Sequence, residues 1–268
     1  MIAAELAHPH DLLVRRFLFE PELMADLLTY YPQSAADRRT VQLLDLRELR
    51  CESPVNVDEN LAEAVGDLRF TAGFRGCSRR SNVFLLFEHQ SKIDRRIRLR
   101  GLDYIVQSYK HFEERSKGKT LFPYPVAVLL YHGKSAWRDL PEMDDMMDRV
   151  SGAERGLLRF PLILIDLSVI SRDNVKGHPA LRTLVAVLQL ASAGKLASGF
   201  DGAMDPLAGV KDDPRVRGWV QSFVRYALSV SKIGKELVIK AFSKILDEKE
   251  AQKMFTSTAQ ELMYKGEV

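Results

Sequence analysis

Three short, uninterrupted apolar runs constrain the fold of this chain more than any other feature of its sequence. They read VFLLF, VAVLLY and PLILI, and each stops at a charged or polar residue. Runs of this length are typical of buried strands, whereas a helix that spans a membrane needs about 18 apolar residues. The sequence therefore predicts three buried strands and no membrane span.

The composition is that of an ordinary globular protein. The 268 residues include 46% hydrophobic and 28% charged side chains, and the net charge of +3 permits contact with nucleic acid without arguing for it. Cys51 and Cys77 suggest neither a disulfide framework nor a metal knuckle, which favours a reducing compartment. The stretch before Asp11 contains His8 and His10 and lacks the apolar core of a secretory signal. We therefore expect a cytoplasmic protein.

Further elements surround the apolar runs. Residues 10–31 show helical spacing with a break at Pro21, and residues 41–50 alternate loosely, as in a first strand. Asp67–Gln90 reads as a hairpin, and residues 94–119 repeat apolar side chains with the period of a helix. With strands expected at 123–133 and 160–170, the pattern predicts a mixed α/β domain over residues 1–175.

From residue 176 the pattern changes to helices alone. Their expected ranges are 179–192, 215–246 and 248–268. The stretch Gly199–Pro214 is rich in glycine, aspartate and proline and predicts a flexible join. Residues 176–268 are thus expected to form a C-terminal helical region.

Polar residues end the first apolar run abruptly, in the stretch FLLFEHQSK at Phe84–Lys92. In a strand, Glu88 and Gln90 would share one face, and Asp67 begins the partner strand of the hairpin. These polar residues mean either that the strand reaches solvent there or that it ends at the rim of a functional site. Two carboxylates and water suit Mg²⁺ or Mn²⁺ and leave positions for a phosphate oxygen and an attacking water. Taken alone, this pattern is a weak signal.

The order of helix, hairpin with Asp67, Glu-His-Gln and helix resembles the PD-(D/E)XK nuclease superfamily. The stretches HDLLVRRFL, FLLFEHQSKIDRRIRLRGLDYIVQSY and PVAVLLYHGKSAW are similar to the YhgA-like transposase family, also called recombination-promoting nucleases. This likeness covers about residues 8–170, and the ending TSTAQELMYKGEV is also similar.

The resemblance implies a restriction-endonuclease-like mixed sheet flanked by helices. It also implies a metal-dependent DNA endonuclease that hydrolyses phosphodiester bonds in recombination or mobile elements. Asp67 and Glu88 match the acids that bind the metal ion, and the backbone carbonyl of His89 matches the group that completes the metal shell. Asp11 matches an acid that joins the site from the first helix.

Gln90 stands where the wider superfamily usually has a lysine that orients the attacking water. If the strand persists, Lys92 would lie on the same face and could restore that charge. Related nucleases carry a polar residue and a tyrosine on the next helix, where this chain has a basic segment. The residues expected to contact DNA are Lys92, Arg95, Arg96, Arg98, Arg100 and Tyr104.

Alternatives stay open at this stage. The glutamine in the Glu-X-Gln pattern also suits a catalytically inactive DNA-binding accessory protein of a mobile element, and the C-terminal helices suit a protein-interaction module. Asp11 is equally suited to capping its helix, Asp67 to a turn or cap, and the arginines to a solvated face. Asp166 is expected to be structural, and His132 to shape a turn. DNA is the expected partner, and assembly into a homo-oligomer is left open.

Overall fold

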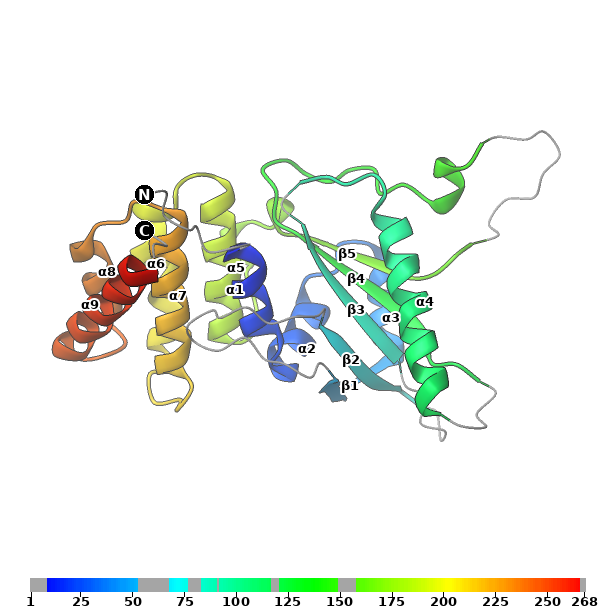
Figure 1. Cartoon of the computed structure of the whole chain (residues 1–268), viewed down its shortest axis with the longest axis horizontal. Helices are drawn as coiled ribbons and strands as arrows, with labels where there is room; N and C mark the ends of the chain where they lie inside the picture. The colour runs from blue at the N-terminus through cyan, green and yellow to red at the C-terminus, as the bar shows by residue number, and fades with distance from the viewer. Residues whose placement is uncertain are drawn as a thin grey trace. The chain divides into compact units, whose positions relative to one another are not determined.

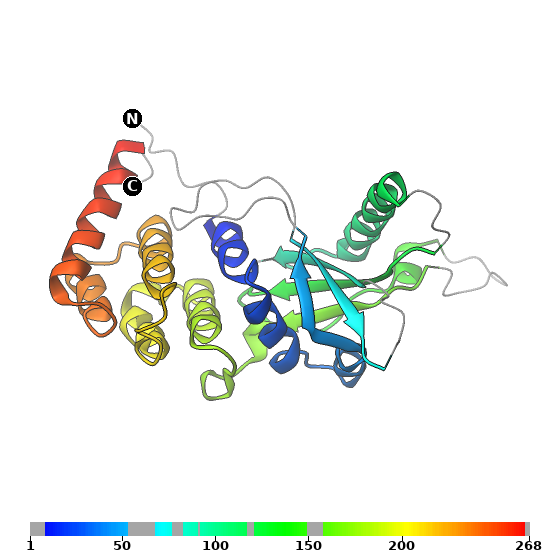
Figure 2. The ribbon, with the colours of Figure 1, turned by 90° about the horizontal axis from the view of Figure 1, so that it is seen from below.

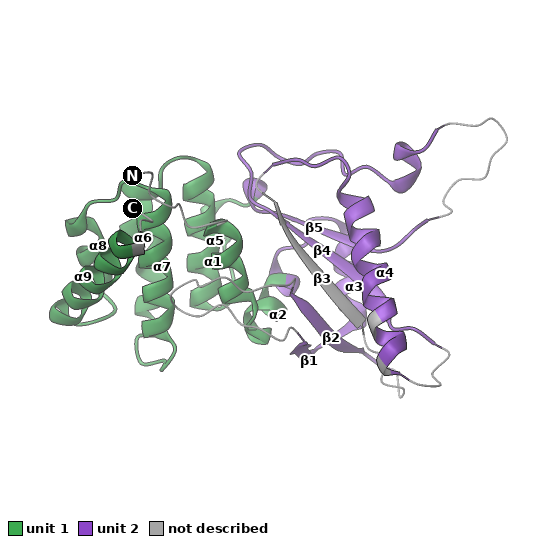
Figure 3. Ribbon diagram, viewed as in Figure 1, with its two compact units in different colours: residues 1–27, 54–66, 170–268 green, residues 28–53, 67–169 purple. Residues whose placement is uncertain are grey.

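The computed structural model describes residues 9–52, 68–76, 83–90, 92–116, 121–148 and 158–265, with the backbone alone for the strand Val83–Gln90. Figure 3 shows two compact units. The sheet unit takes its residues from 28–53 and 67–169, and the helical unit from 1–27, 54–66 and 170–268. These units differ from the predicted domains, 1–175 and 176–268, mainly in residues 1–27, which the sequence places with the sheet.

The sheet unit is built on a five-stranded sheet with the order β1-β2-β3-β4-β5. The strands are β1 (Leu44–Cys51), β2 (Arg69–Phe74), β3 (Val83–Gln90), β4 (Tyr124–Tyr131) and β5 (Leu162–Asp166). The pairs β1/β2 and β2/β3 are antiparallel, and the pairs β3/β4 and β4/β5 are parallel. The apolar runs lie in β3, β4 and β5, as predicted, and the predicted hairpin is formed by β2 and β3.

Two helices flank the sheet, α3 (Ala35–Leu43) behind it and α4 (Ile97–Arg115) in front of it in Figure 1. The segment that contains α4 connects β3 to β4, as a parallel pair of strands requires. Residues 126–131 of β4 are buried without interruption, as in a strand covered on both faces. The predicted fold class, a mixed α/β sheet flanked by helices and followed by a helical region, is confirmed.

The first strand begins later than the sequence predicts, because residues 41–43 belong to α3. This helix starts after Ser34, whose side-chain oxygen accepts a hydrogen bond of 2.9 Å from the backbone N–H of Asp37. In α3 the buried residue is Val41, whereas Leu43 is 58% exposed. An apolar stripe this weak gives little helical periodicity to detect.

The helical unit holds helices that lie side by side, several of them seen nearly end on in Figure 2. None of the helices in the described ranges combines the length and hydropathy that crossing a bilayer requires. Short 3-10 turns occur at Met143–Met146 and Leu167–Val169 in the sheet unit and at Arg172–Asn174 in the helical unit. The helices are α1 (Pro9–Leu18), α2 (Pro21–Tyr30, with residues in both units), α5 (Pro179–Ser192), α6 (Leu196–Ala208), α7 (Val216–Val230), α8 (Lys235–Phe242) and α9 (Glu248–Lys265).

The flexible join predicted at Gly199–Pro214 is wrong, because α6 occupies most of that stretch. Apolar residues spaced three or four apart bury one face of α6, namely Leu196, Phe200, Ala203, Met204 and Leu207. The range 215–246, predicted as one helix, is interrupted between Val230 and Lys235, where Gly234 is the extended N-cap of α8.

Candidate active site at the end of strand β3

Glu88, His89 and Gln90 are the last three residues of β3. Their backbones pair in parallel with Leu129, Leu130 and Tyr131 of β4. Tyr131 in turn pairs with Asp166, the last residue of β5. Three parallel strands therefore end level with one another, and the carboxyl ends of such strands are where open α/β sheets commonly place their sites.

The antiparallel partner of β3 approaches this end from the other side. Phe70 pairs with Leu85 and Arg69 pairs with Leu86, and the buried residue Leu68 precedes β2. Asp67, the first predicted metal ligand, lies outside the described residues. Its predicted convergence with Glu88 therefore stays a prediction.

Asp166 has a structural part at this end of the sheet, as expected. Its Oδ2 accepts a 2.8 Å hydrogen bond from the backbone N–H of Trp137, and its Oδ1 accepts from the backbone and the hydroxyl of Ser168 at 2.8 and 2.6 Å. Asp166 is 4% exposed, so these donors supply the hydrogen bonds that its buried carboxyl group requires. Asp166 thereby ties the segments after β4 and β5 together.

The turn after β4 folds back onto its last residue. The hydroxyl of Tyr131 donates a 2.8 Å hydrogen bond to the backbone carbonyl of Ser135. A Cβ atom at Gly133 would lie 2.0 Å from that hydroxyl oxygen, so the close approach requires glycine. The neighbouring His132 is 2% exposed, and its expected role in shaping the turn stays a prediction.

The start of α4 packs beside the end of β4. Ile97 forms a buried cluster with Leu129, Tyr131 and Trp137. The carboxylate of Asp94 accepts a 2.8 Å hydrogen bond from the backbone N–H of Arg96, which fixes the turn that enters the helix. The end of β4 and the basic segment are therefore neighbours in the sheet unit.

The side chains of this basic segment differ in exposure. Lys92, Arg95, Arg96 and Arg100 are exposed, while Tyr104 is half-buried. The guanidinium of Arg100 lies 3.6 Å from the carboxylate of Asp94. These exposed cations are accessible to a phosphate from solution, because none of them is buried.

Arg98 is the exception among the arginines. It is 7% exposed, and its guanidinium donates to the backbone carbonyl of Pro141 and the carboxylate of Glu142, both at 2.6 Å. Burial lowers the pKa of Arg98, and Glu142 acts in the opposite direction. Arg98 therefore anchors the segment after β4, and a phosphate would have to displace Glu142 to reach it.

A signal in the sequence distinguishes Arg98 from its neighbours. It precedes Leu102 by four residues and Ile105 by seven, so the periodicity that predicts the helix also places Arg98 on the inner face. Ile105 is buried and Leu102 is partly buried, as that periodicity requires. Composition alone does not distinguish the buried Arg98 from the exposed arginines of the stretch RRIRLR.

α1 is placed in the helical unit, where its polar residues have partners. Asp11 Oδ2 lies 2.9 Å from Arg15 Nε, an ion pair one turn apart on the same helix. A 2.7 Å hydrogen bond joins His10 Nδ1 to the hydroxyl of Tyr226 on α7. Burial lowers the pKa of His10 and raises that of Tyr226. Asp11 and Glu88 belong to different compact units, and the predicted part of Asp11 in the metal site stays a prediction.

Among the described residues, no group of three or more His, Cys, Asp or Glu side chains lies close enough to hold a metal ion. Asp67 and the side chain of Glu88 lie outside that set. The predicted metal site, with its Mg²⁺ or Mn²⁺, therefore stays a prediction.

Curated proteins similar to this chain are bacterial. Recombination-promoting nuclease RpnD of Escherichia coli O157:H7 is 28% identical over 185 residues, which are 68% of this chain and 66% of that protein. Recombination-promoting nuclease RpnA of Escherichia coli K12 is 26% identical over 178 residues, covering 66% and 58% of the two chains. Inactive recombination-promoting nuclease-like protein RpnE of the same strain is 22% identical over 191 residues, covering 69% and 59%.

The matched region spans less than two thirds of the length of these relatives. No solved structure is significantly similar to this chain. A family model described as "Putative transposase, YhgA-like" matches residues 8–214, which include all five strands of the sheet. The match covers most of the chain, and the chain therefore belongs to the YhgA-like transposase family.

Proposed function

We propose that this protein is a metal-dependent DNA endonuclease of the PD-(D/E)XK type, with its site at the end of β3. In this proposal Asp67 and Glu88 hold a Mg²⁺ or Mn²⁺ ion, and Gln90 positions the attacking water. The reaction is hydrolysis of a phosphodiester bond, without a covalent enzyme intermediate. The observation that carries the proposal is the register of β2 and β3.

Along this antiparallel pair, each step back on β2 is a step forward on β3: Phe70 faces Leu85, and Arg69 faces Leu86. If the pairing continued for two more residues, position 67 would lie opposite Glu88. Residues directly opposite in such a pair have Cβ atoms about 4.5–5.5 Å apart on one face of the sheet. Two carboxylates at that separation are near enough to share one cation.

The chemistry of these donors fits a hard divalent cation. Two carboxylates and a backbone carbonyl, from His89, offer oxygen ligands and leave positions for water and a phosphate oxygen. The bound ion would stabilise the charge that develops on the scissile phosphate. Gln90 provides hydrogen bonds to hold a water but, unlike lysine, no fixed positive charge.

The start of α4 supplies the groups proposed to contact DNA. The exposed Lys92, Arg95, Arg96 and Arg100 surround the first turn of a helix, where cations are disfavoured by the helix dipole. A phosphate bound there would relieve this cost, and the phosphate backbone supplies most of the affinity in nonspecific DNA binding. Tyr104 lies one turn beyond Arg100 on the same helix and is proposed to support this contact.

Two relatives are named recombination-promoting nucleases, which supports a nuclease linked to recombination. A second candidate, an inactive DNA-binding accessory protein, is favoured by Gln90 and by the relative named inactive. The two candidates share the DNA partner and differ only in cleavage. A cleavage assay therefore separates them.

The test is nicking of supercoiled plasmid DNA by the purified full chain with Mg²⁺ or Mn²⁺. We expect the wild-type protein to nick the plasmid and a chelator to abolish nicking. Asp67→Ala and Glu88→Ala should each reduce the rate at least about 100-fold, because loss of groups that merely support metal ligands already costs about 10–100-fold. Glu113→Ala, which removes an exposed acid from α4, is the matched control and should cleave normally. Full activity in both site variants would refute the site, and DNA binding without cleavage would favour the accessory protein.

A further inference from the structure

We propose that a second DNA contact lies in the helical unit, on the exposed face of α9. A groove of about 520 Å³ runs along this face beside the first residue of α8. We call it the α9 groove. It is lined by Lys235, Lys249, Gln252, Lys253, Thr256, Ser257 and Gln260.

The two faces of α9 have different parts. Ala251, Met254, Thr258 and Leu262 recur every three or four residues and are buried. The groove residues recur with the same spacing, and all of them are exposed. One stripe of α9 therefore packs in the helical unit, and a second, polar stripe is exposed to solvent.

Charge distinguishes the α9 groove from an ordinary polar surface. Its lining has three lysines, two amides and two hydroxyls, and no carboxylate. Two acids of α9 are engaged elsewhere, since Glu250 pairs with Arg217 at 3.2 Å and Glu261 pairs with the buried Arg225, while Glu248 is exposed at the start of the helix. Lysine, glutamine, serine and threonine side chains are typical donors to the phosphates of nucleic acids.

The length of the groove suits a polyanion better than a single phosphate. Residues 249 and 260 are about 16 Å apart along the helix axis. Duplex DNA carries one negative charge for about every 1.7 Å of its axis, so several phosphates fall within that length. The groove lysines would each meet a phosphate, and the amides and hydroxyls would hydrogen-bond between them.

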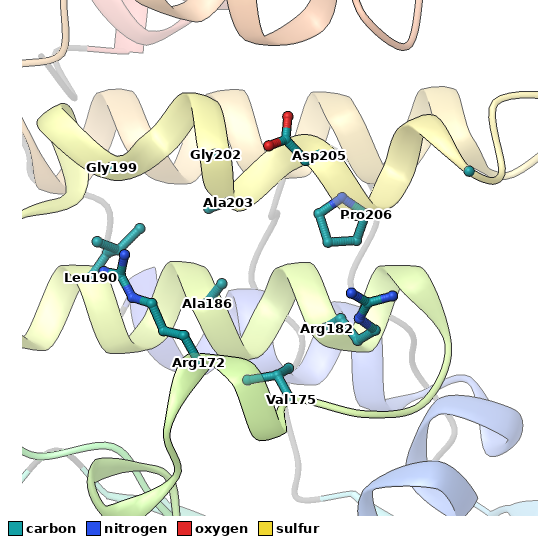
Figure 4. A pocket seen from close by; sticks show the side chains of 11 residues that line it. Arg172, Val175, Arg182, Ala186, Leu190, Gly199, Gly202, Ala203, Asp205 and Pro206 are labelled. Atoms are coloured by element: carbon teal, nitrogen blue, oxygen red, sulfur yellow. The ribbon is translucent and has the colours of Figure 1, made fainter.

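Another cavity of the helical unit makes the contrast clear. It lies between α5 and α6, has a volume of about 560 Å³ and is shown in Figure 4. Arg172 and Arg182 lie near its two ends, and small residues such as Gly202 and Ala203 form much of the remaining wall. Asp205 of α6 also lines the cavity, with its carboxylate directed away from α5 in Figure 4. Asp205 also pairs with Lys244 at 2.7 Å. Mixed charges of this kind do not select a polyanion.

This inference rests on the proposed function for the identity of the ligand and adds a second surface that contacts DNA. It requires a binding measurement, because cleavage alone depends on both sites. Binding of a fluorescent DNA duplex to the full chain is measured by anisotropy, without divalent ions, over a range of salt concentrations. The test variant is Lys249→Gln/Lys253→Gln, which keeps long polar side chains on the helix.

The control variant is Lys195→Gln/Lys211→Gln, which removes the same charge from exposed lysines of the helical unit outside the groove. We expect the test variant to bind at least about tenfold more weakly than the control. The negative slope of log affinity against log salt should become less steep by about 2, because each of the two substituted lysines no longer neutralises a phosphate. Equal binding by the two variants would overturn the inference, as would binding of wild type to anionic-lipid vesicles but not to DNA.

The two proposals fail in different ways. If wild type cuts nothing but the groove variant still loses DNA affinity, the nuclease proposal fails and the α9 groove stands. If wild type cuts DNA that both variants bind equally well, the groove fails and the nuclease stands. Thermal unfolding of each variant must match wild type, so that weaker binding is not caused by unfolding.

Discussion

The end of β3 and the helix α1 both carry residues predicted for one metal site, but the structure gives them different surroundings. At the end of β3, backbone register aligns Glu88–Gln90 with the ends of two parallel strands. On α1, Asp11 pairs with Arg15 and His10 pairs with Tyr226. One region is placed by the sheet ladder, and the other is occupied by contacts within the helical unit.

The two regions differ in how far the local sequence determines the position of a polar side chain. A polar residue that ends a buried strand is fixed in position by the strand itself, whichever partner it later binds. A polar residue on an amphipathic helix faces whatever packs against that helix, which the local sequence does not specify. The position of Glu88 therefore follows from the topology of the sheet, whereas Asp11 and His10 have contacts that account for them without a metal ion.

The first prediction compares the loss of cleavage caused by a substitution at the end of β3 with that caused by a substitution on α1. Glu88→Ala should abolish cleavage, whereas Asp11→Ala should leave the rate within about threefold of wild type, because a partly exposed i,i+4 ion pair contributes only about 0.5 kcal/mol. The initial rates of plasmid nicking at saturating Mg²⁺ compare the variants. An Asp11→Ala protein as inactive as Glu88→Ala, with unchanged stability, would show that Asp11 of α1 belongs to the site.

A second prediction asks whether α1 depends on the helical core. Phe17 of α1 stacks against Phe223 of α7 with ring centroids 4.5 Å apart, and both side chains are fully buried. Phe223→Ala should lower the free energy of unfolding by about 3–5 kcal/mol, since it leaves a cavity the core cannot fill. Denaturant unfolding followed by circular dichroism measures this change.

Leu99→Ala is a suitable control for that measurement, because Leu99 is 50% exposed on α4. It should change the unfolding free energy by less than about 1 kcal/mol. An effect at Phe223 no greater than this would mean that the packing of α1 on α7 contributes little.

The sequence predicts β3, β4 and β5 well because each contains a distinct apolar run. The apolar runs in β3, β4 and β5 are uninterrupted and end at polar residues, so their existence and order follow from local composition. The place of α1 depends on contacts such as Phe17 with Phe223, which join residues far apart in the chain. Long-range packing of this kind leaves no local periodicity to detect.

The site follows the same division. The position of Glu88–Gln90 at a strand end is local and was predictable, whereas the engagement of Arg98 with Glu142 depends on a distant segment. The periodicity of α4 nevertheless marks Arg98 as an inner residue. In α6, glycine and proline suggest a break, and only the spacing of Phe200, Ala203 and Leu207 indicates a helix.

A third prediction tests why α6 contains glycines. A Cβ atom at Gly199 would lie 2.4 Å from Cδ2 of the buried Leu190, whereas at Gly202 it would meet nothing within 4 Å. Gly199→Ala should therefore destabilise the protein by about 1–3 kcal/mol through overpacking. Gly202→Ala should stabilise it by about 0.5–1 kcal/mol, because alanine favours a helix more than glycine does. Similar effects of both changes on thermal unfolding would mean that α5 and α6 are not closely packed at Gly199.

The smallest expected effect depends on pH and concerns the start of α7. The Arg215 guanidinium, hydrogen-bonded to Asp213, lowers the pKa of that carboxyl to about 2. A lowered pKa in the folded state stabilises the protein above the unfolded value of about 3.9, and this contribution is lost as pH falls through about 2. Asp213→Asn keeps an oxygen for the backbone N–H of Arg215 but loses the charge.

The Asp213→Asn protein should therefore be less stable than wild type at pH 6, by less than about 1 kcal/mol because the pair is partly exposed. The difference should shrink between pH 4 and about pH 2, where wild type loses the same charge. Melting temperatures across this pH range provide the measurement, with Asp173→Asn, which changes an exposed acid in the turn Arg172–Asn174, as the control. A constant difference across that range would show that the amide disturbs the turn by its shape, so that the charge of Asp213 contributes nothing to holding α7.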